Sequence, residues 1–541
     1  MKCILSAVLG RRVPRVCRQS CRYLAFLIER GNRRRFVAGR LCVSTARVTS
    51  SGSLRSGPMP NSLAYLMLTL WPAVTLAMYL WMPPRSAVIW SILAGYMLLP
   101  AATTLDLPGL PGLNKYSIPS LFGYVYASLI LGRIIPLFPE TRLGRIFCVM
   151  LLLAPFLTVA TNRDLIFVTR DNVLPALRLY DAVSVLLGQL GTLCIWALAR
   201  DILSDARALR QVVTAIVVAF LWYSVPMLYE VRMSPQLHIM IYGFFQHDFM
   251  QMMRQGGFRP IVFLEHGLLV AILTAMSAML AVVLARSAPR EDANRWYLAA
   301  AYLLVVLVLC KSMAALVYAI FLMPMLLILS PRRLMQIAMG MGVVILSYPI
   351  LRTLDVIPTD WMAEMAGRMS ADRAQSLQFR FDNEDALLAH AMQRPLFGWG
   401  GWARAVVHDP VTGQDISVAD GLWVISMGYG GFFSFIAQFG LLLLPVFLLG
   451  RAHRAAGREV GILAAGVSLV LALNMVDLLP NASITPVTWL ISGSLLGYLE
   501  ALRRAAPDAD QAQAGSVPVA RKRAAFAGLV GVPSHGPRSL L

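Results

Sequence analysis

The sequence predicts an all-α polytopic membrane protein, with about 12 to 13 transmembrane helices and one large helical loop on the outer face. Of its 541 residues, 58% are hydrophobic and only 14% are charged, whereas charged residues make up about 25% of a typical soluble protein. Apolar runs of roughly 17 to 25 residues recur along the chain, which is the length that crosses a bilayer as a helix. Such segments must be helical because the bilayer offers no partner for an unpaired backbone amide.

Thirteen apolar segments are expected to span the membrane. Joined as one helix, 296–310 and 313–329 would run about 51 Å, which is too long for a bilayer. As two helices each is short, and Lys311-Ser312 between them offers no turn residue. The expected spans are 61–82, 86–104, 117–135, 146–160, 181–199, 211–229, 263–285, 296–310, 313–329, 335–351, 422–449, 460–478 and 484–501.

Arginine placement predicts the orientation, because cytoplasmic loops carry an excess of Lys and Arg. With thirteen spans, six arginine-bearing connections fall on one side, which is therefore cytoplasmic together with the C-terminus. The opposite side receives residues 161–180, 230–262 and 352–421. The six groups are Arg142 with Arg145; Arg200, Arg207 and Arg210; Arg286, Arg290 and Arg295; Arg332 with Arg333; Arg451, Arg454 and Arg458; and Arg503 with Arg504.

The N-terminal residues 1–58 form a basic extension with twelve arginines and Lys2 against a single acid, Glu29. Nucleic-acid binding, an amphipathic or targeting segment, and a true start at Met59 are the three interpretations. Thirteen spans would place these arginines outside the cell, against the rule that set the orientation. Topology therefore favours a true start at Met59, and no nucleic-acid partner is expected. The competing explanation is that the span count is wrong by one. The expected organisation is the extension 1–58, ten helices in 59–351, the loop 352–421, three helices in 422–501, and a disordered cytoplasmic tail, 502–541.

The loop 352–421 is the longest polar segment and has a composition typical of ordered structure. Asp382 or Asn383 is expected to cap a helix that runs to Arg394, where Pro395 stops it. Long ordered loops in compact proteins are commonly functional. We therefore expect a helical cap on the outer membrane face.

One face of that helix carries His390 and Arg394 at helical spacing. Gly398 and Gly400 follow, and glycines permit a tight turn or close approach of backbone to a ligand. The competing interpretation is an amphipathic surface helix whose charges are merely solvated.

Further ionisable residues on the same side stand where the chain meets the membrane. Lys311 lies between two apolar runs, where it is either functional or extends to the interface. Cationic side chains bind phosphate and diphosphate strongly, and a neighbouring acid can deprotonate a hydroxyl. The set consists of Arg259, Glu265 and His266 at one span entry, Lys311, Arg380 in the loop, and Asp420 where the loop re-enters the membrane.

Four segments resemble, in order, the bacterial O-antigen ligase and O-antigen/exopolysaccharide polymerase superfamily, over about residues 180–500. They are "GGFRPIVFLEHG", "CKSMAAL", "FRFDNEDALLAHAMQRPLFGWGGW" and "ADGLWVISMGYGGFFSFIAQFGLL". The resemblance implies a GT-C-like membrane glycosyltransferase of the bacterial inner membrane. Its site would face the periplasm, and the loop 352–421 would be periplasmic.

The resemblance also implies a metal-independent, cofactor-free, inverting transfer from a glycan on undecaprenyl diphosphate to a glycan or lipid-linked acceptor, with a chain-length regulator as a possible partner. Such enzymes serve exopolysaccharide and lipopolysaccharide biosynthesis. Asp420 or His408 would be the catalytic base. Cations would hold the diphosphate, and neighbouring residues would support the loop. The cations are Arg259, Lys311, Arg380 and Arg394; the supporting residues are His390, Gly398, Gly400, Glu265 and His266.

The sequence departs from the family at one important position. Ligases carry a histidine, often His-Asn, just before the span that follows the loop, where this chain has Asp420-Gly421. The aspartate is closer to the polymerase branch, so polysaccharide polymerase is the expected function. A ligase acting on lipid A-core or another acceptor, and a non-catalytic polysaccharide or glycolipid transporter, are the alternatives.

Overall fold

The computed structural model describes residues 59–106, 111–170, 172–254, 256–369, 371–455 and 460–515. The basic extension 1–58 lies outside these residues, as does the tail beyond residue 515. Within the described part, the chain is an all-α polytopic membrane protein with two very small hairpins as its only sheet. A helix occupies each of the thirteen expected spans.

Eight of the described helices are long and apolar enough to cross a membrane, and three more are apolar but shorter. The eight are α4 (Ser62–Trp81), α7 (Arg142–Ala160), α8 (Leu179–Ile202), α9 (Ala206–Met233), α11 (Gly267–Ser287), α12 (Arg290–Leu309), α14 (Pro331–Thr353) and α17 (Leu422–Ala455). The shorter ones are α6 (Ser117–Ile130), α13 (Met313–Ile328) and α18 (Ile462–Asp477). The two remaining expected spans, 86–104 and 484–501, are occupied by α5 (Pro84–Leu98) and α19 (Pro486–Gly515).

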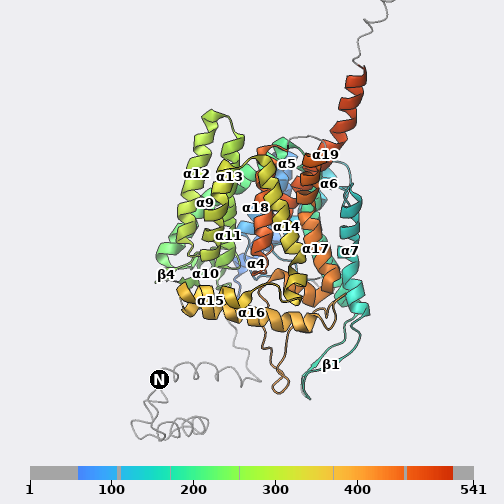
Figure 1. Cartoon of the computed structure of the whole chain (residues 1–541), viewed down its shortest axis with the longest axis vertical. Coiled ribbons are helices and arrows are strands. Elements are labelled where there is room, and N and C mark those ends of the chain that lie inside the picture. The colour runs from blue at the N-terminus through green and yellow to red at the C-terminus, as the bar shows by residue number, and fades with distance from the viewer. Residues whose placement is uncertain are drawn as a thin grey trace, which may run out of the picture. The chain divides into compact units, whose positions relative to one another are not determined.

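These helices run up and down, so the connections alternate between two ends of the bundle (Figure 1). The described members of the six arginine groups fall at one end, called the arginine end below, as the sequence predicted, while Arg458 lies outside the described residues. Connections at this end bind one another: Arg286 donates to the carbonyl oxygen of Leu329, 2.9 Å away, and Arg210 donates to that of Ser287, 3.0 Å away. The other end carries the two helices of the long loop and is called the cap end.

Helix α11 lies at the centre of the bundle and is buried along almost its whole length. It contacts α9, α12, α13 and α18. Alanine, glycine and serine make up much of its surface, and small residues let membrane helices approach closely. The hydroxyls of Thr274 and Ser277 bond back to carbonyls one turn earlier, so they add no unpaired polar group to the core. The residue before α11, His266, therefore stands at a fixed point of the cap end.

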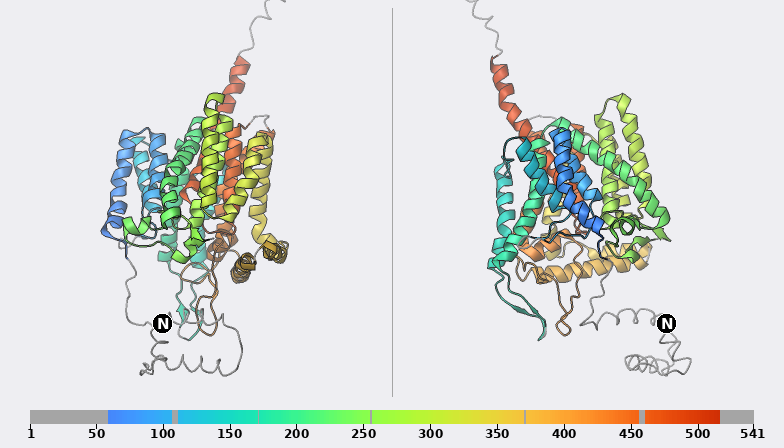
Figure 2. Two further views of the ribbon diagram at one scale, coloured as in Figure 1. Left: turned by 90° about the vertical axis from the view of Figure 1, so that its left-hand side faces the viewer. Right: turned by 180° about the vertical axis from the view of Figure 1, so that it is seen from behind.

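Two helices of the long loop, α15 (Thr359–Met369) and α16 (Ala371–Ala391), lie across the cap end, roughly perpendicular to the bundle (Figures 1 and 2). They form the expected helical cap. The predicted helix start at Asp382 or Asn383 is wrong, because α16 begins eleven residues before Asp382. Ala, Arg, Gln and Leu in residues 371–381 favour helix, so α16 extends through the position expected to cap it.

The break between α12 and α13 resolves the difficulty of the overlong apolar run. The chain turns at Lys311, which adopts a left-handed conformation with φ of 52°. A non-glycine residue in this conformation costs free energy and is commonly found at functional sites.

The last helix is longer than expected. Helix α19 continues to Gly515, where disorder was expected from residue 502. Alanine, arginine and glutamine are strong helix formers, and extending an existing helix avoids the cost of nucleation.

Short elements complete the cap end. The hairpin β1 (Ile166–Phe167) and β2 (Val173–Leu174) follows α7 and projects away from the bundle (Figure 1). Between α9 and α11 lie α10 (Leu237–Tyr242), the 3₁₀ helix η2 (Phe249–Met252), and the hairpin of β3 (Met253–Arg254) with β4 (Gly257–Phe258). This second hairpin leads directly into Arg259.

Candidate functional site

A cavity of ≈ 440 Å³ opens beneath α16 at the cap end. The starts of α13 and α17, the ends of α14 and α18, and the segment before α11 form its walls. Three of the residues predicted from sequence, Arg259, Arg380 and Asp420, line it together. Leu268, Met313, Ala314, Tyr318, Tyr348, Leu387 and Val424 are among its apolar lining residues, so charged groups share the cavity with a surface suited to hydrocarbon.

Arg259 is buried, with 7% of its surface exposed, and forms no ion pair with any described residue. Its guanidinium donates to the carbonyl oxygen of Lys311, 3.0 Å away, while its Nε has no partner among the described residues. Burial lowers the pKa of Arg259 to about 10, and the like charges of Arg254 and Arg380 act in the same direction. The side chain is still cationic at neutral pH, so the cavity holds a buried positive charge without a counter-ion.

Arg380 and Asp420 are neighbours in the lining of the cavity. The guanidinium Nε of Arg380 lies 3.8 Å from Oδ2 of Asp420, and both side chains are partly exposed, at 37% and 42%. Arg380 also donates to the carbonyl oxygen of Pro480, 3.4 Å away, which directs it over the end of α18. The loop before Asp420 is fixed by Asn383, whose Oδ1 accepts from the backbone N–H of Val418 at 2.7 Å. The carboxylate is therefore accessible from the cavity and held by neighbours.

Glu384 is a second carboxylate in this cavity, and the sequence did not single it out as a site residue. Trp423 donates to Glu384 at 2.9 Å, and the Nε of Arg352 lies 3.6 Å from its carboxylate. Burial raises the pKa of Glu384, while the Trp423 hydrogen bond and the Arg352 charge oppose the rise. Its oxygens are thus committed to protein partners, unlike those of Asp420.

A buried carboxylate positions the segment that carries Arg259. Glu230, fully buried in α9, accepts from the backbone N–H groups of Ile261 and Val262, both at 2.8 Å, and from Leu237 at 3.1 Å. Val262 has a φ of 52°, so this bonding holds a strained backbone. No periodicity in the sequence marked Glu230 as part of this site.

Glu265 and His266 were expected to support the loop, but they lie in the segment that leads into α11, and neither lines the cavity. Glu265 lies 3.2 Å from the ammonium of Lys115, a lysine that is only 2% exposed. His266 caps α11 by accepting from the N–H of Leu268 at 2.8 Å. Burial, and then the charges of His247, Arg259, Arg380 and Arg254, lower the pKa of His266 to about 4, so this imidazole is neutral at physiological pH.

Lys311 acts on the cavity through its backbone. Its carbonyl oxygen accepts from Arg259, while its ammonium turns to the β3–β4 hairpin and donates to the carbonyl oxygen of Arg254 at 3.0 Å. Lys311 itself does not line the cavity, although Ser312 does. The expectation that its ammonium joins the diphosphate-binding cations is therefore not met by the geometry.

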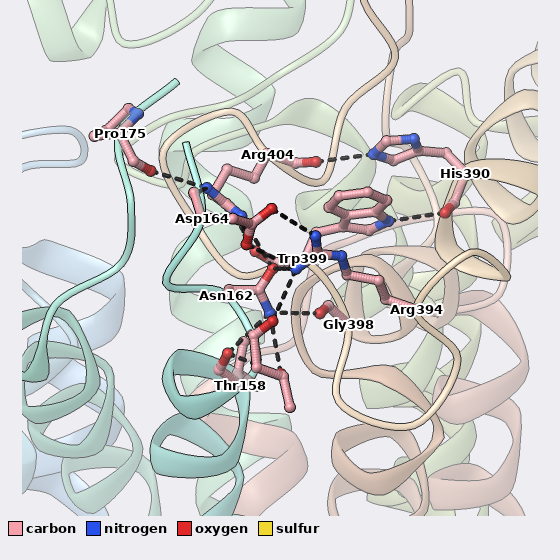
Figure 3. Close-up of polar contacts among 10 residues, drawn as sticks. Thr158, Asn162, Asp164, Pro175, His390, Arg394, Gly398, Trp399 and Arg404 are labelled. Carbon is pink, nitrogen blue, oxygen red and sulfur yellow. Dashed lines mark hydrogen bonds and ion pairs between the residues drawn. The ribbon is translucent and has the colours of Figure 1, made fainter. Parts of the chain in front are cut away.

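Arg394 belongs to a different cluster, on the side of the cap that faces α7 (Figure 3). Its guanidinium binds Asp164 at 2.8 Å and Asn162 at 2.6 Å, and stacks over Trp399 with 4.2 Å between guanidinium carbon and ring centre. Arg404, 1% exposed, binds the same aspartate at 3.2 Å. Arg394 therefore does not join Arg259 and Arg380, because Asp164 holds it elsewhere.

The residues expected to support the loop, His390, Gly398 and Gly400, lie at the end of α16 and in the segment after it, called the supporting loop below. His390 stacks on Trp399 with ring centres 4.5 Å apart and bonds the carbonyl oxygen of Arg404 at 2.9 Å. The backbone of 398–400 runs beside a break in α17 at Gly431: Trp399 N–H donates to Gly428 at 2.7 Å, and Gly400 N–H donates to Tyr429 at 3.0 Å. The glycine-rich segment thus supplies the hydrogen bonds that the broken helix lacks.

His408, the alternative base, lies away from the cavity. Its Nε2 bonds the carbonyl oxygen of Ala403 at 2.8 Å, within the turn that follows the supporting loop. It pairs in an isolated bridge with Asp415 and is not a lining residue of the cavity. Of the two candidate bases, Asp420 is the one that shares the cavity with the arginines.

Gly398→Ala is expected to destabilise the protein strongly. Gly398 has a φ of 64°, and a Cβ there would lie 2.6 Å from the amide nitrogen of Gly430 and 2.7 Å from the carbonyl oxygen of Gly428. Backbone atoms cannot give way as a flexible side chain does, so we expect a loss of at least about 2 kcal/mol in free energy of unfolding. Gly401→Ala is the matched control, because its Cβ would meet nothing closer than 4.0 Å. Thermal unfolding of both purified variants in detergent tests this; equal melting temperatures would contradict it.

Asp164→Asn is expected to remove a pH-dependent part of the stability. The hydrogen bond from Arg394 is the largest contribution that lowers the pKa of Asp164 below its usual value, and burial opposes it. A carboxyl whose pKa is lowered on folding stabilises above its unfolded pKa, about 4, and this contribution disappears as the pH falls through its folded pKa. Since Asp164 is 49% exposed, solvent screening limits the effect to about 1 kcal/mol. The variant should melt below wild type at pH 7 and converge with it below pH 4. Asp360→Asn is the control, on exposed α15, and the difference between its melting temperature and that of wild type should not change with pH in this way.

Among the described residues, no group of three or more His, Cys, Asp or Glu side chains is placed to hold a metal ion. No protein-family model matches the sequence, and no curated protein matches it either. Function is therefore inferred from the cavity itself.

Proposed function

We propose that this protein is a membrane glycosyltransferase that transfers or polymerises glycan repeat units from undecaprenyl-diphosphate-linked donors at the periplasmic face of the bacterial inner membrane. The observation that carries the proposal is the buried, unpaired Arg259 beside Arg380 and Asp420 in one amphiphilic cavity. A buried cation is costly unless an anion compensates it. An anionic ligand that enters this cavity would supply the missing charge.

A lipid diphosphate fits the cavity better than a soluble anion does. The ≈ 440 Å³ would take a diphosphate with adjoining groups, in the range of pockets that hold drug-sized ligands, about 300–1,000 Å³. Met313, Ala314 and Tyr318, at the start of α13, continue the lining with apolar surface suited to a polyprenyl chain. The tail and most of the glycan would extend beyond the cavity. The excess of arginine at the other end supports a periplasmic position for the cap end.

The proposed chemistry is a direct displacement at the anomeric carbon of the donor. Asp420 accepts the proton of an acceptor hydroxyl as its oxygen attacks that carbon. The bond between the anomeric carbon and the diphosphate oxygen breaks, and its electron pair leaves with undecaprenyl diphosphate. Arg259 and Arg380 stabilise the charge that develops on the leaving group. One displacement inverts the anomeric configuration.

A single reconstitution tests the proposal. Purified full-length protein in liposomes receives lipid-linked oligosaccharide from its own cells, with EDTA present, and the products are resolved by length on a gel. A ladder of longer lipid-linked glycans is the expected result and identifies a polymerase. In a parallel reaction, transfer to added lipid A-core would identify a ligase, which the same site serves equally well. Unchanged donor in both reactions, with the protein folded, would remove the enzymatic proposal and leave a transporter.

A further inference from the structure

A second amphiphilic cavity, of ≈ 460 Å³, lies at the arginine end, between α5 and α9, at the opposite end of the bundle from the cavity beneath α16. Arg207 and Arg210 line it near the start of α9, and Ile89 and Val218 line it further along the helices. Trp90 lines the same cavity, and tryptophan side chains favour the headgroup level of a bilayer.

One face of α9 carries side chains that change from cationic to apolar along the helix. Arg207, Arg210, Gln211, Thr214, Ala215 and Val218 recur at intervals of three, one, three, one and three residues, which places them in a single helical stripe. Along this stripe the side chains change from cationic to polar and then to apolar, over about 16 Å of helix rise. A phospholipid changes in the same order, from phosphate through glycerol esters to acyl chain.

The charge at this part of the cavity is positive and available. Arg207 is exposed and Arg210 half-buried, and neither forms an ion pair with any described residue. The nearby acid Asp205 is already paired with Arg85. Arg210 keeps donor capacity beyond its bonds to the carbonyl and hydroxyl of Ser287.

We infer that this cavity is a binding site for an anionic phospholipid. The phosphate is held by Arg207 and Arg210, and one acyl chain lies along Ile89, Trp90 and Val218. Basic pockets between membrane helices on the cytoplasmic side bind anionic headgroups in this way. The site is independent of the glycosyltransferase proposal and would hold even if that proposal failed.

Native mass spectrometry of the purified full-length protein tests the site. Phosphatidylglycerol and phosphatidylcholine with the same acyl chains are titrated separately, and glycerol phosphate is added as a soluble competitor. We expect tighter binding of phosphatidylglycerol, a loss of about fivefold in its affinity in Arg207→Gln, and no competition by glycerol phosphate. Arg332→Gln, an exposed arginine at the same end and outside the stripe, is the control and should change affinity less than twofold.

Three results would overturn the inference: equal affinity for the two lipids, equal weakening by Arg207→Gln and Arg332→Gln, or displacement by glycerol phosphate, which would indicate a free-phosphate site. Arg210→Gln also loses its bonds to Ser287 and so could weaken folding. Arg207 is exposed and its side chain bonds none of the described residues, so Arg207→Gln tests the site without this complication.

Discussion

Asp420→Asn is expected to lower kcat at least about a hundredfold, the lower range for loss of a general base, while undecaprenyl diphosphate still binds. The carboxylate is partly exposed in the cavity, and Arg380 is the only described residue with which it pairs. Asparagine keeps the shape and cannot accept the hydroxyl proton. It also frees Arg380, so donor affinity should stay the same or rise. The measurement pairs turnover in liposomes with titration of undecaprenyl diphosphate.

Asp415→Asn is the matched control, since this aspartate lies in the same loop and bonds Ser417 at a distance from the cavity. It should leave both turnover and binding near wild type. If Asp420→Asn instead abolished binding, the residue would hold the ligand rather than act as a base. If turnover persisted, Glu384 would be the remaining carboxylate in the cavity.

The two carboxylates of the cavity show why the position of Asp420 could be predicted from the sequence and that of Glu384 could not. Asp420 stands where a polar loop enters an apolar span, a position visible in the sequence. Glu384 lies inside a helix among other acids, and only folding brings it to Trp423 and Arg352. A position at a membrane boundary is a local property, whereas burial of a helical acid depends on distant partners.

The spans were predictable because bilayer thickness fixes the length of an apolar helix. Because successive spans alternate in direction, the order of the thirteen spans also predicted that the segments of Arg259, Arg380 and Asp420 lie at the same end. Arg394 was misplaced because helical spacing fixes its face but gives no information on Asp164, 230 residues earlier, which binds it. Lys311 was misplaced because its left-handed backbone could not be anticipated for a lysine between two apolar runs.

The second large effect concerns two buried arginines that should respond in opposite ways to the same substitution. Arg259→Met is expected to keep or raise the melting temperature while weakening undecaprenyl diphosphate binding at least about thirtyfold, the lower range for losing one partner of a buried charge pair. Replacing an uncompensated buried charge with an apolar side chain of similar length removes a desolvation cost, which outweighs the loss of the hydrogen bond to the carbonyl oxygen of Lys311. The same change removes the positive charge that is proposed to compensate the diphosphate.

Arg404→Met is the control and should lower the melting temperature without affecting the cavity beneath α16. Arg404 is also buried, yet it donates to the carbonyl oxygens of Asp164 and Pro175, at 2.8 and 3.0 Å, and pairs with the carboxylate of Asp164. Methionine would leave these buried acceptors unpaired, at a cost of about 1–3 kcal/mol for each unsatisfied group. Measured together, the two variants separate a cation kept for a ligand from one kept for the fold. A drop in stability for Arg259→Met, with donor binding unchanged, would place Arg259 in the second class and remove the main support for an anionic donor in this cavity.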